Sequence, residues 1–365
     1  ENKNGTTNDV VTAITIDNNN NEESDQDLIQ QADQLFGDDK LLAAARLLRK
    51  VQDNTLLTEQ HYQRLQKAER FEQVVRDLNS APGPEWTKQG ESHNGKRDTI
   101  IYYQVQNSKL TARIETPIEK SLLVPLLAVF NESDLYVTWI PNFDYPVKLG
   151  LTKSVKLRQE GRCHQLILAN AYMPWPFSTR EVVIDAMAID DIDANGAIVV
   201  KMEKGKDDDP HIPPKETPDT VRADFDGGLL FRKCPHDHPT LLHSKTETRS
   251  AGEHSSGNND SDGGLILVCF TMCVDSHISY VPKDLINFVT RSVLGLMWGQ
   301  LLQVAEDIRE GKREQHVAAI QAKQELYAWV EERVQVLLAN IVNDGGSGCE
   351  KQHDLKESNE NIKSE

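Results

Sequence analysis

The chain has 365 residues, of which 38% are hydrophobic and 27% charged, and its formal net charge is -17. This length suits one large domain with flanking elements or two domains, and the composition is that of an acidic globular protein. The negative charge argues against nucleic acid as a partner. It also opposes non-specific adhesion to anionic lipid, so any membrane contact has to be local and assisted by apolar insertion.

The cysteines and the apolar segments indicate in which cellular compartment the protein is expected. Five cysteines are scattered along the chain, at Cys163, Cys234, Cys269, Cys273 and Cys349. An odd number without paired spacing does not indicate a disulfide framework, so we expect reduced thiols. No apolar stretch is long enough to span a bilayer. We therefore expect a cytoplasmic protein that meets membranes only at their surface.

The two ends of the chain differ in character from the middle. Residues 1–24 are rich in Asn, Thr and acidic side chains, and residues 343–365 contain a Gly-Gly-Ser-Gly linker followed by polar residues. Such segments bury too little apolar surface to offset the entropy of ordering, and we expect both to be disordered. Residues 25–80 show apolar side chains at helical spacing, which predicts a helical extension with a break at Gly37 and a weak helix cap at Thr58 and His61.

After Pro84 the pattern changes to strands. The expected strands cover residues 99–105, 110–115, 155–158, 164–169, 182–189, 197–202, 220–225 and 265–274, with a helix at 118–130 and solvent loops at 205–218 and 250–264. One long helix over 283–309 follows them, and a further amphipathic helix is expected within 312–342. The order predicts an α+β fold in which an antiparallel sheet is wrapped around a long C-terminal helix.

Two motifs resemble those of a known family. Residues 174–183 read Pro-Trp-Pro-Phe-Ser-Thr-Arg-Glu-Val-Val, and residues 274–288 combine a strand end, a proline and the start of the long helix. Together with Trp86 and the strand at Val221, they resemble the START (steroidogenic acute regulatory related lipid transfer) domains over residues 81–311. The usual glycine before the second proline is replaced by Tyr280-Val281, and residues 250–264 look inserted, so a particular subfamily's ligand cannot be carried over.

The resemblance implies a helix-grip fold, in which a curved sheet grips the C-terminal helix and encloses a tunnel for one lipid. The helix from Lys283 is apolar over a wide arc, which suits a wall shared between the sheet and a ligand and, with adjacent loops, a lid. Gly295 and Gly299 lie within it and indicate close backbone approach or local opening. An ordinary core helix without a cavity is the alternative, because periodicity does not separate the two.

Nine residues are candidates for lipid binding. They are Trp175, Phe177, Arg180, Arg222, Leu285, Phe288, Val289, Leu296 and Trp298. Trp175 lies between two prolines and suits the headgroup boundary of a membrane, or else packs inward at the rim of the tunnel. For Arg180 we favour an ion pair with a carboxylate over contact with a ligand, since a buried arginine normally needs such a partner.

Weaker motifs point to other chemistry. The segment from Asp191 to Gly196 matches the opening of a calcium loop but lacks the closing glutamate, so a hairpin turn explains it better. Cys234, His236, His238 and His243 match no common zinc spacing. We therefore predict neither metal nor cofactor. No nucleophile elbow, phosphate loop or dinucleotide motif is found, which disfavours an enzyme on the same fold.

Two functions follow as hypotheses. The first is a carrier or sensor that binds one lipid, with transient contact to a membrane surface and no catalysis. The alternative is a protein-interaction scaffold in which the helices flanking the START-like region bind a protein partner. The lipid class stays open between sterol, phospholipid, ceramide and fatty acid, because selectivity depends on a few polar groups whose orientation a sequence does not give.

Overall fold

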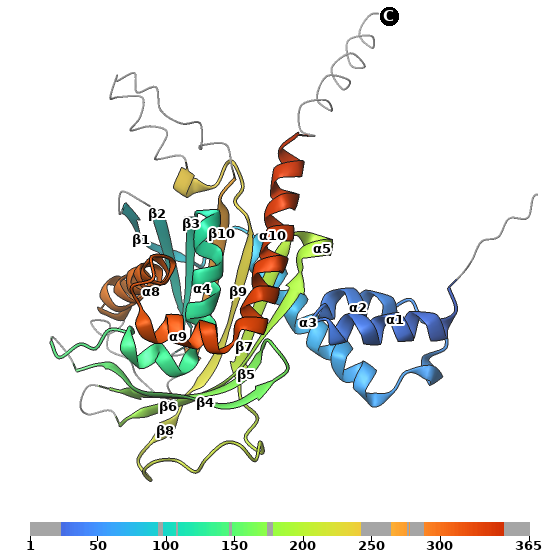
Figure 1. Cartoon of the computed structure of the whole chain (residues 1–365). Coiled ribbons are helices and arrows are strands. Elements are labelled where there is room, and N and C mark those ends of the chain that lie inside the picture. The colour runs from blue at the N-terminus through green and yellow to red at the C-terminus, as the bar shows by residue number, and fades with distance from the viewer. Residues whose placement is uncertain are drawn as a thin grey trace, which may run out of the picture.

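The computed structural model describes residues 23–93, 98–106, 109–145, 148–173, 178–241, 264–275, 277 and 288–346. The expected disordered segments at 1–24 and 343–365, the loop 250–264 and the start of the long helix therefore lie wholly or largely outside the described residues. Within them, a large antiparallel sheet carries helices on both of its faces (Figure 1). The α+β class expected from the sequence is confirmed.

Three helices precede the sheet: α1 (Asp25–Gly37), α2 (Leu41–Leu48) and α3 (Glu59–Asn79). The break after Gly37 is where the sequence predicts it, and Asp39 takes a positive φ of 60° there. The weak cap is a complete capping box: Thr58 Oγ1 accepts from the His61 amide at 3.4 Å, and His61 Nδ1 accepts from the Thr58 amide at 3.1 Å. A short helix, η1 (Asn54–Leu56), connects α2 to α3.

The sheet has ten strands in the part that is described. They are β1 (Thr87–His93), β2 (Asp98–Gln106), β3 (Lys109–Ile118), β4 (Gly150–Glu160), β5 (His164–Tyr172), β6 (Arg180–Asp191), β7 (Ala197–Lys204), β8 (Val221–Arg222), β9 (Asp224–Lys233) and β10 (Ile266–Asp275). The order is β1-β2-β3-β10-β9-β7-β6-β5-β4, and the short β8 pairs in parallel with β6. All of the other pairs are antiparallel.

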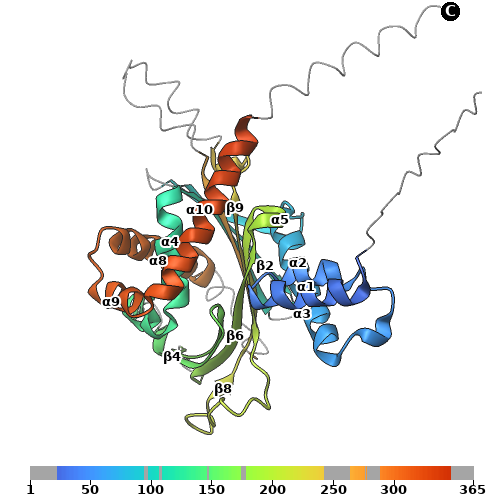
Figure 2. The same ribbon diagram turned by 45° about the vertical axis from the view of Figure 1, so that its right-hand side comes forward.

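The remaining helices lie between the strands or follow them. They are η2 (Lys120–Leu122), α4 (Leu123–Asn131), η3 (Ser133–Thr138), α5 (Ile192–Asn195), the π-helical turn η4 (Val289–Val293), α8 (Leu294–Arg309), α9 (Glu314–Ala322) and α10 (Gln324–Gly346). Both edges of the sheet bend toward one side, where β1 contacts η4 and β4 contacts η3. Figures 1 and 2 show α4, α8, α9 and α10 on this inner side and α1, α2 and α3 on the outer side.

The two central strands β9 and β10 are buried on both faces, which explains their unbroken apolar runs. Leu229, Phe231, Val268 and Phe270 join the inner core with α4, α8 and α10, whereas Leu230, Leu267 and Cys269 alternate with them and join the outer core with α2 and α3. Strand pairing sets Phe270 beside Ile114 of β3 and Leu229 of β9. Two apolar layers thus share one sheet.

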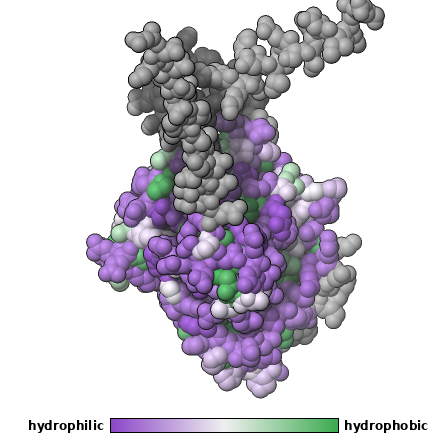
Figure 3. Space-filling view, turned by 90° about the vertical axis from the view of Figure 1, so that its right-hand side faces the viewer, coloured by the Kyte–Doolittle hydropathy of each residue, from purple (hydrophilic) through white to green (hydrophobic). Residues whose placement is uncertain are grey.

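Helix α3 is fixed to the outer face by a buried ion pair as well as by packing. Arg113 of β3 bonds to Glu115 and donates to the carbonyl oxygens of Asp77 at 2.8 Å and Leu78 at 3.2 Å, in the last turn of α3. These carbonyls have no partner within the helix, so the guanidinium caps its C-terminus. Viewed from the side of α1–α3, the described surface is mostly hydrophilic (Figure 3). The apolar faces of these helices are turned inward.

Helix α10 also packs within the chain. Val334, Leu337 and Ile341 of this helix belong to the inner core that α4, α8 and the sheet form. The helix extends to Gly346, four residues beyond the expected end of the helical segment at 342, and a separate helix, α9, precedes it. In the described structure the apolar faces of α3 and α10 therefore pack against opposite faces of one sheet.

Candidate functional site

A cavity of about 350 Å³ lies between the inner face of the sheet and the helices that cover it. The sheet contributes, among others, Ile167, Ala169, Ile184, Ala186, Ala188, Ile198, Val200, Met202, Leu229, Phe270 and Met272. The covering helices contribute Leu127, Phe130, Tyr136, Met297, Trp298, Leu301, Leu326, Tyr327, Trp329 and Val330, and Trp139 follows η3. This volume lies at the small end of the range for ligand pockets, and the lining is almost entirely apolar.

The cavity exists because small side chains occupy the middle of the inner face. Ile184, Ala186 and Ala188 alternate along β6 and line the cavity, as residues on one face of a strand do. Ala169 of β5 lines it as well. The methyl groups of three alanines do not reach the helix layer, and the aromatic rings on the opposite wall do not fill the space that is left. A close-packed core would not tolerate such a void without an occupant or a cost in stability.

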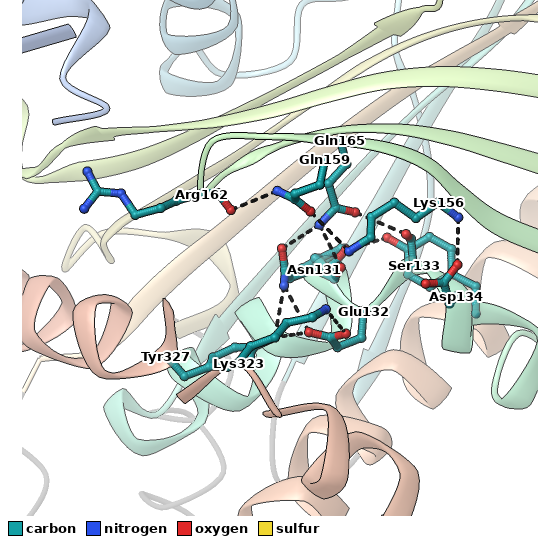
Figure 4. A network of polar contacts seen from close by, with 12 residues as sticks. Asn131, Glu132, Ser133, Asp134, Lys156, Gln159, Arg162, Gln165, Lys323 and Tyr327 are labelled. Atoms are coloured by element: carbon teal, nitrogen blue, oxygen red, sulfur yellow. Dashed lines mark hydrogen bonds and ion pairs between the residues drawn. The ribbon is translucent and has the colours of Figure 1, made fainter. Parts of the chain in front are cut away.

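One end of the cavity is bordered by a closed network of polar groups, drawn in Figure 4. Glu132, which follows α4, accepts hydrogen bonds from the Tyr327 hydroxyl at 2.6 Å and from Lys323 Nζ at 2.5 Å. Asn131 donates to Glu132 Oε1 at 3.0 Å and accepts from Gln165 Nε2 at 2.7 Å. Each of these groups is satisfied by another part of the protein, so the network fixes α10 to α4 and β5 rather than offering free hydrogen-bonding groups.

The electrostatics of this network favour a charged Glu132. Burial alone would raise the pKa of this carboxyl, but the hydrogen bonds from Lys323 and Tyr327 hold it below its ordinary value. Burial and the neighbouring carboxylate raise the pKa of the Tyr327 phenol, which stays protonated as the donor. Burial also raises the pKa of Cys163, a thiol that lines the cavity, to about 12. That sulfur is therefore a poor nucleophile.

A second set of ion pairs holds α10 at the connection between β6 and β7. Arg333 Nε donates to Asp190 at 2.5 Å, and its Nη2 donates to Asp193 at 2.8 Å. Lys40, just before α2, bonds to the same Asp193 at 2.6 Å. This connection is a hairpin between the antiparallel strands β6 and β7, as expected, and its turn is the one-turn helix α5, closed by Gly196 at a φ of 60°. The α1–α2 junction and α10 thus meet at one carboxylate.

Arginine and tryptophan add a third contact between α10 and the rest of the fold. The guanidinium of Arg162, in the turn between β4 and β5, lies 4.4 Å from the centre of the Trp329 ring. Its Nε also donates to Asp39 at 2.8 Å. A cation over an indole face is attracted by the negative electrostatic potential that the quadrupole of the neutral ring produces there, most strongly where water is excluded. Trp329 lines the cavity, so this contact fixes part of the cavity wall.

Two tryptophans of the wall differ in their hydrogen bonding. Trp298 of α8 stacks on Phe270 with 5.7 Å between ring centres, and its Nε1 donates to Thr116 Oγ1 at 2.8 Å. Trp139, which is 9% exposed, lies edge-on to Tyr136 with 5.7 Å between ring centres. Its buried Nε1 has no hydrogen-bond partner among the described residues.

The sequence-predicted site residues are spread over several places. Trp175, Phe177 and Leu285 lie outside the described residues. Trp298 lies on the cavity wall, whereas Leu296 on the same helix is 46% exposed. Phe288 contacts Phe143 edge-on with 5.4 Å between ring centres, and Val289 begins the π-helical turn.

The two candidate arginines lie away from the described cavity lining. Arg222 bonds to Glu181 at 2.6 Å and to the carbonyl of Pro213. Arg180 is buried at the start of β6 and donates to the carbonyl of Ser178 at 2.7 Å. The carboxylate ion pair of this region is thus seen for Arg222, and the ion pair that we expected for Arg180 stays a prediction.

Sequence reasoning missed the contribution of α10 and of the segment at 131–139. Leu326, Tyr327, Val330 and Arg333 of α10 line the cavity, although their helix follows the region of family resemblance. Their amphipathic spacing shows that one face is buried but not against which surface. Spacing of this kind could have identified α10 as a packed helix and could not have placed it over the cavity.

The described residues give no sign of a metal site or a membrane span. No group of three or more His, Cys, Asp or Glu side chains there is placed to hold a metal ion. His238, from the Cys-Pro-His-Asp-His segment, is engaged instead by Glu115 at 3.2 Å and Thr240 at 2.7 Å. Among the described helices, none combines the length and the apolar character that crossing a membrane requires.

Comparison with known proteins gives structural matches at low sequence identity. No family model matches the chain, and no curated protein matches it. The similar solved structures include human STARD10, with 13% identity over 74% of this chain and 89% of that one and a TM-score of 0.46. Human StAR-related lipid transfer protein 5 has 13% identity over 67% and 98%, with a TM-score of 0.44. A StAR-related lipid transfer protein fragment from Xanthomonas axonopodis has 16% identity over 61% and 99%, with a TM-score of 0.41.

Proposed function

We propose that this protein binds one lipid molecule in the cavity between the sheet and helices α4, α8 and α10, and that it carries or senses that lipid. The observation that supports this most directly is the apolar lining of the 350 Å³ cavity. An empty apolar cavity of this size costs stability in proportion to its volume, at roughly 24 cal/mol per Å³ in a well-studied case. An apolar occupant restores the missing contacts, whereas water finds few polar partners there.

Enclosing the hydrocarbon of a lipid would also allow the protein to move that lipid through water. Exposing an acyl chain to water costs about 0.8 kcal/mol per methylene, so a sixteen-carbon chain costs on the order of 12 kcal/mol. Movement of a free lipid through water is slow for this reason. A protein that covers the chain removes most of this cost and leaves only the step at which the cavity opens.

The same wall argues for binding without catalysis. The described lining residues include no serine, histidine or lysine, and the thiol of Cys163 stays protonated. The one lining carboxylate, Asp190, is neutralised by Arg333 at 2.5 Å. General acid–base or nucleophilic catalysis needs a group with a pKa suited to the task and with access to the substrate. We therefore propose that the ligand leaves the cavity unchanged.

We further propose that α10 acts as the cover of the cavity, a role that the sequence suggested for the long helix before it. Helix α8 is deeply buried, with Trp298, Leu301 and Val304 in the inner core. Helix α10 is attached at the cavity by polar contacts through Tyr327, Arg333 and, just before the helix, Lys323. Its buried core residues Val334, Leu337 and Ile341 lie in the later turns of the helix. Such contacts exchange with water at lower cost than apolar packing does, so α10 is the better candidate for the wall that opens.

Transient contact with a membrane surface is part of the proposal. Tyr145 is 87% exposed, and Tyr172 at the end of β5 is 38% exposed. Lys148 lies 4.6 Å from the centre of the Tyr172 ring. Exposed tyrosines and a lysine suit the boundary between headgroups and acyl chains, where aromatic rings are enriched. The net charge of -17 restricts this contact to a small area.

The experiment that tests lipid binding compares the wild-type chain with two variants, in each of which one alanine is replaced by phenylalanine. Ala186→Phe fills the cavity from the sheet, whereas Ala328→Phe adds the same ring to an exposed position of α10. Each protein is incubated with mixed-lipid vesicles, re-isolated and extracted with organic solvent, and the extract is analysed by mass spectrometry. We expect about one lipid per chain for wild type and Ala328→Phe and a large loss for Ala186→Phe.

The proposal is wrong if folded wild-type protein takes up no lipid, or if Ala186→Phe takes up as much as wild type. Circular dichroism and thermal unfolding of each protein establish that it is folded. A loss of lipid in both variants would assign the effect to the added ring in general and not to the cavity.

A further inference from the structure

The two tryptophans of the cavity wall pose a question about the ligand. The Trp298 indole N–H is satisfied by Thr116 Oγ1 at 2.8 Å. The Trp139 N–H is buried and has no partner among the described residues, although its ring lines the same cavity. More than nine in ten buried polar groups in proteins have a hydrogen-bond partner, so the Trp139 N–H calls for an explanation.

The chemistry of indole restricts what the missing partner is. The Nε1 atom is a donor only, so its partner has to be an acceptor such as an oxygen atom. Tyr136, whose ring packs against Trp139, donates its hydroxyl to the Phe130 carbonyl at 2.7 Å, and no described acceptor lies within hydrogen-bond reach of Trp139 Nε1. Tyr136 packs edge-on against Trp139 with an interplanar angle of 77°, which restrains the indole ring. The Trp139 ring lines the cavity, so a bound ligand is the group that can bring an acceptor to this side chain.

The charges around the cavity restrict the ligand in a different way. Among the described lining residues, Arg333 is the one cation and Asp190 the one anion, and they bond to each other at 2.5 Å. Arg333 also bonds to Asp193 at 2.8 Å. An ionised phosphate or carboxylate inside the cavity would have to break these bonds or be buried without a counter-charge, and both are costly.

The other polar lining groups are occupied as well. Asn131, Gln165 and Tyr327 bond to one another and to Glu132 at distances between 2.6 and 3.1 Å. A ligand gains little by replacing one of these bonds with its own. Apart from the weak donor of the Cys163 thiol, the Trp139 N–H is thus the available side-chain donor in the described part of the wall.

Resting on the proposed lipid-binding function, we propose that the ligand is an uncharged lipid with an oxygen acceptor, a hydroxyl or carbonyl, that accepts a hydrogen bond from Trp139 Nε1. Its hydrocarbon fills the apolar cavity, and this single bond orients it. Trp139 is then a specificity residue, which distinguishes an oxygenated lipid from a hydrocarbon, and the paired charges of the wall exclude anionic lipids.

The test uses three probes that differ only at one end: dodecan-1-ol, dodecane and dodecyl phosphate. The full chain, Trp139→Phe and Trp298→Phe are equilibrated with each probe supplied from a cyclodextrin complex, and the bound amount is measured by mass spectrometry of solvent extracts. The quantity of interest is the ratio of the affinities for dodecan-1-ol and dodecane. Comparing this ratio between proteins cancels the different hydration of the two probes.

We expect Trp139→Phe to lower this ratio by about fivefold, the usual worth of one hydrogen bond. Trp298→Phe is the matched control, because the N–H of Trp298 is already bonded to Thr116. This variant should bind both probes more weakly and leave the ratio of their affinities as in wild type. Dodecyl phosphate should bind more weakly than dodecan-1-ol. An unchanged ratio in Trp139→Phe, or a preference for dodecyl phosphate, overturns the proposal.

A measurement on the unaltered protein covers the case in which Trp139→Phe does not fold. In a ¹⁵N-labelled sample the indole N–H resonance of Trp139 should move downfield with dodecan-1-ol and not with dodecane, and the absence of this difference overturns the proposal. If the protein binds both dodecane and dodecan-1-ol and Trp139→Phe leaves the ratio of their affinities unchanged, lipid binding stands and the role of Trp139 fails. If the folded protein binds none of the three probes and takes no lipid from vesicles, the proposed function itself fails.

Discussion

The Tyr327 hydroxyl donates a hydrogen bond to Glu132 Oε1 at 2.6 Å, and this bond joins α10 to the end of α4 beside the cavity. Lys323 Nζ binds the other carboxylate oxygen at 2.5 Å. The carboxylate is buried, so it needs both partners to remain charged. The position of α10 over the cavity and the ionisation of Glu132 therefore depend on each other.

Removing the Tyr327 hydroxyl should destabilise the protein. Tyr327→Phe leaves Glu132 Oε1 without its shortest hydrogen bond, which should lower the free energy of unfolding by about 1–3 kcal/mol. Urea unfolding followed by circular dichroism measures this change. The matched control is Tyr62→Phe, since Tyr62 is 46% exposed and its hydroxyl donates to the Asn54 carbonyl at 3.3 Å. Equal stability changes in the two variants would contradict the role of Tyr327.

The contribution of Glu132 should depend on pH in the acid range. Its pKa in the folded protein lies below the ordinary value of 4.5: burial acts to raise it, but the bonds from Lys323 and Tyr327 outweigh burial. A carboxyl whose pKa is lowered by folding stabilises the protein fully above its unfolded pKa and loses this contribution as pH falls through the folded value. The stability difference between wild type and Glu132→Gln should thus be constant near neutral pH and shrink below about pH 4.5.

Unfolding curves for both proteins at half-unit steps between pH 7 and pH 3.5 would measure this difference. A difference that grows as pH falls would show that Glu132 is protonated more easily in the folded protein than in the unfolded chain. That result would contradict the assigned direction of the pKa shift.

Much of the sheet could be predicted from the sequence because inner and outer residues alternate. The expected strands at 164–169, 182–189 and 197–202 lie within β5, β6 and β7. Strand β1 was missed: its sequence, Thr-Lys-Gln-Gly-Glu-Ser-His, is polar because it lies at the edge of the sheet. The apolar part of β9 after Gly228 was missed too, whereas the comparable run of β10, which is also buried on both faces, was predicted.

The site was harder to predict than the fold. Motif resemblance directed attention to Arg180, Arg222 and Leu296, which do not belong to the described cavity lining. The residues that shape the cavity are small ones, Ala169, Ala186 and Ala188, whose effect comes from the volume that they leave empty. Neither a void nor an unpartnered indole N–H leaves a sequence pattern, because both depend on what packs opposite.

Packing of α3 on the sheet should make the N-terminal helices part of the same cooperative unit. Phe71 is 1% exposed and joins Leu230 and Leu267 in the outer core, so Phe71→Ala should cost about 3–5 kcal/mol. We expect one thermal transition at a lower temperature, detected equally by far-ultraviolet circular dichroism and by tryptophan fluorescence. Leu56→Ala is the control, since Leu56 is 38% exposed. Two separate transitions would show instead that residues 25–80 unfold as an independent extension.

The glycines of α8 and β9 should respond in opposite ways to alanine. A Cβ at Gly299 would meet nothing within 4 Å among the described residues, so close approach does not explain this glycine. Gly299→Ala should raise the free energy of unfolding by about 1 kcal/mol, the difference in helix propensity. At Gly228 a Cβ would lie 2.7 Å from Val74 Cγ1 of α3, so Gly228→Ala should destabilise by about 1–3 kcal/mol.

The rate of lipid uptake tests why position 299 holds a glycine although alanine should stabilise the helix. If α8 has to open locally for lipid to enter, Gly299→Ala should slow lipid uptake from vesicles several-fold. The same variant should unfold at a higher urea concentration than wild type. Uptake at the wild-type rate would remove α8 from the opening step and leave α10 as the moving wall. In that case Tyr327→Phe, which loosens α10, should speed both uptake and release, because it lowers the cost of separating Tyr327 from Glu132.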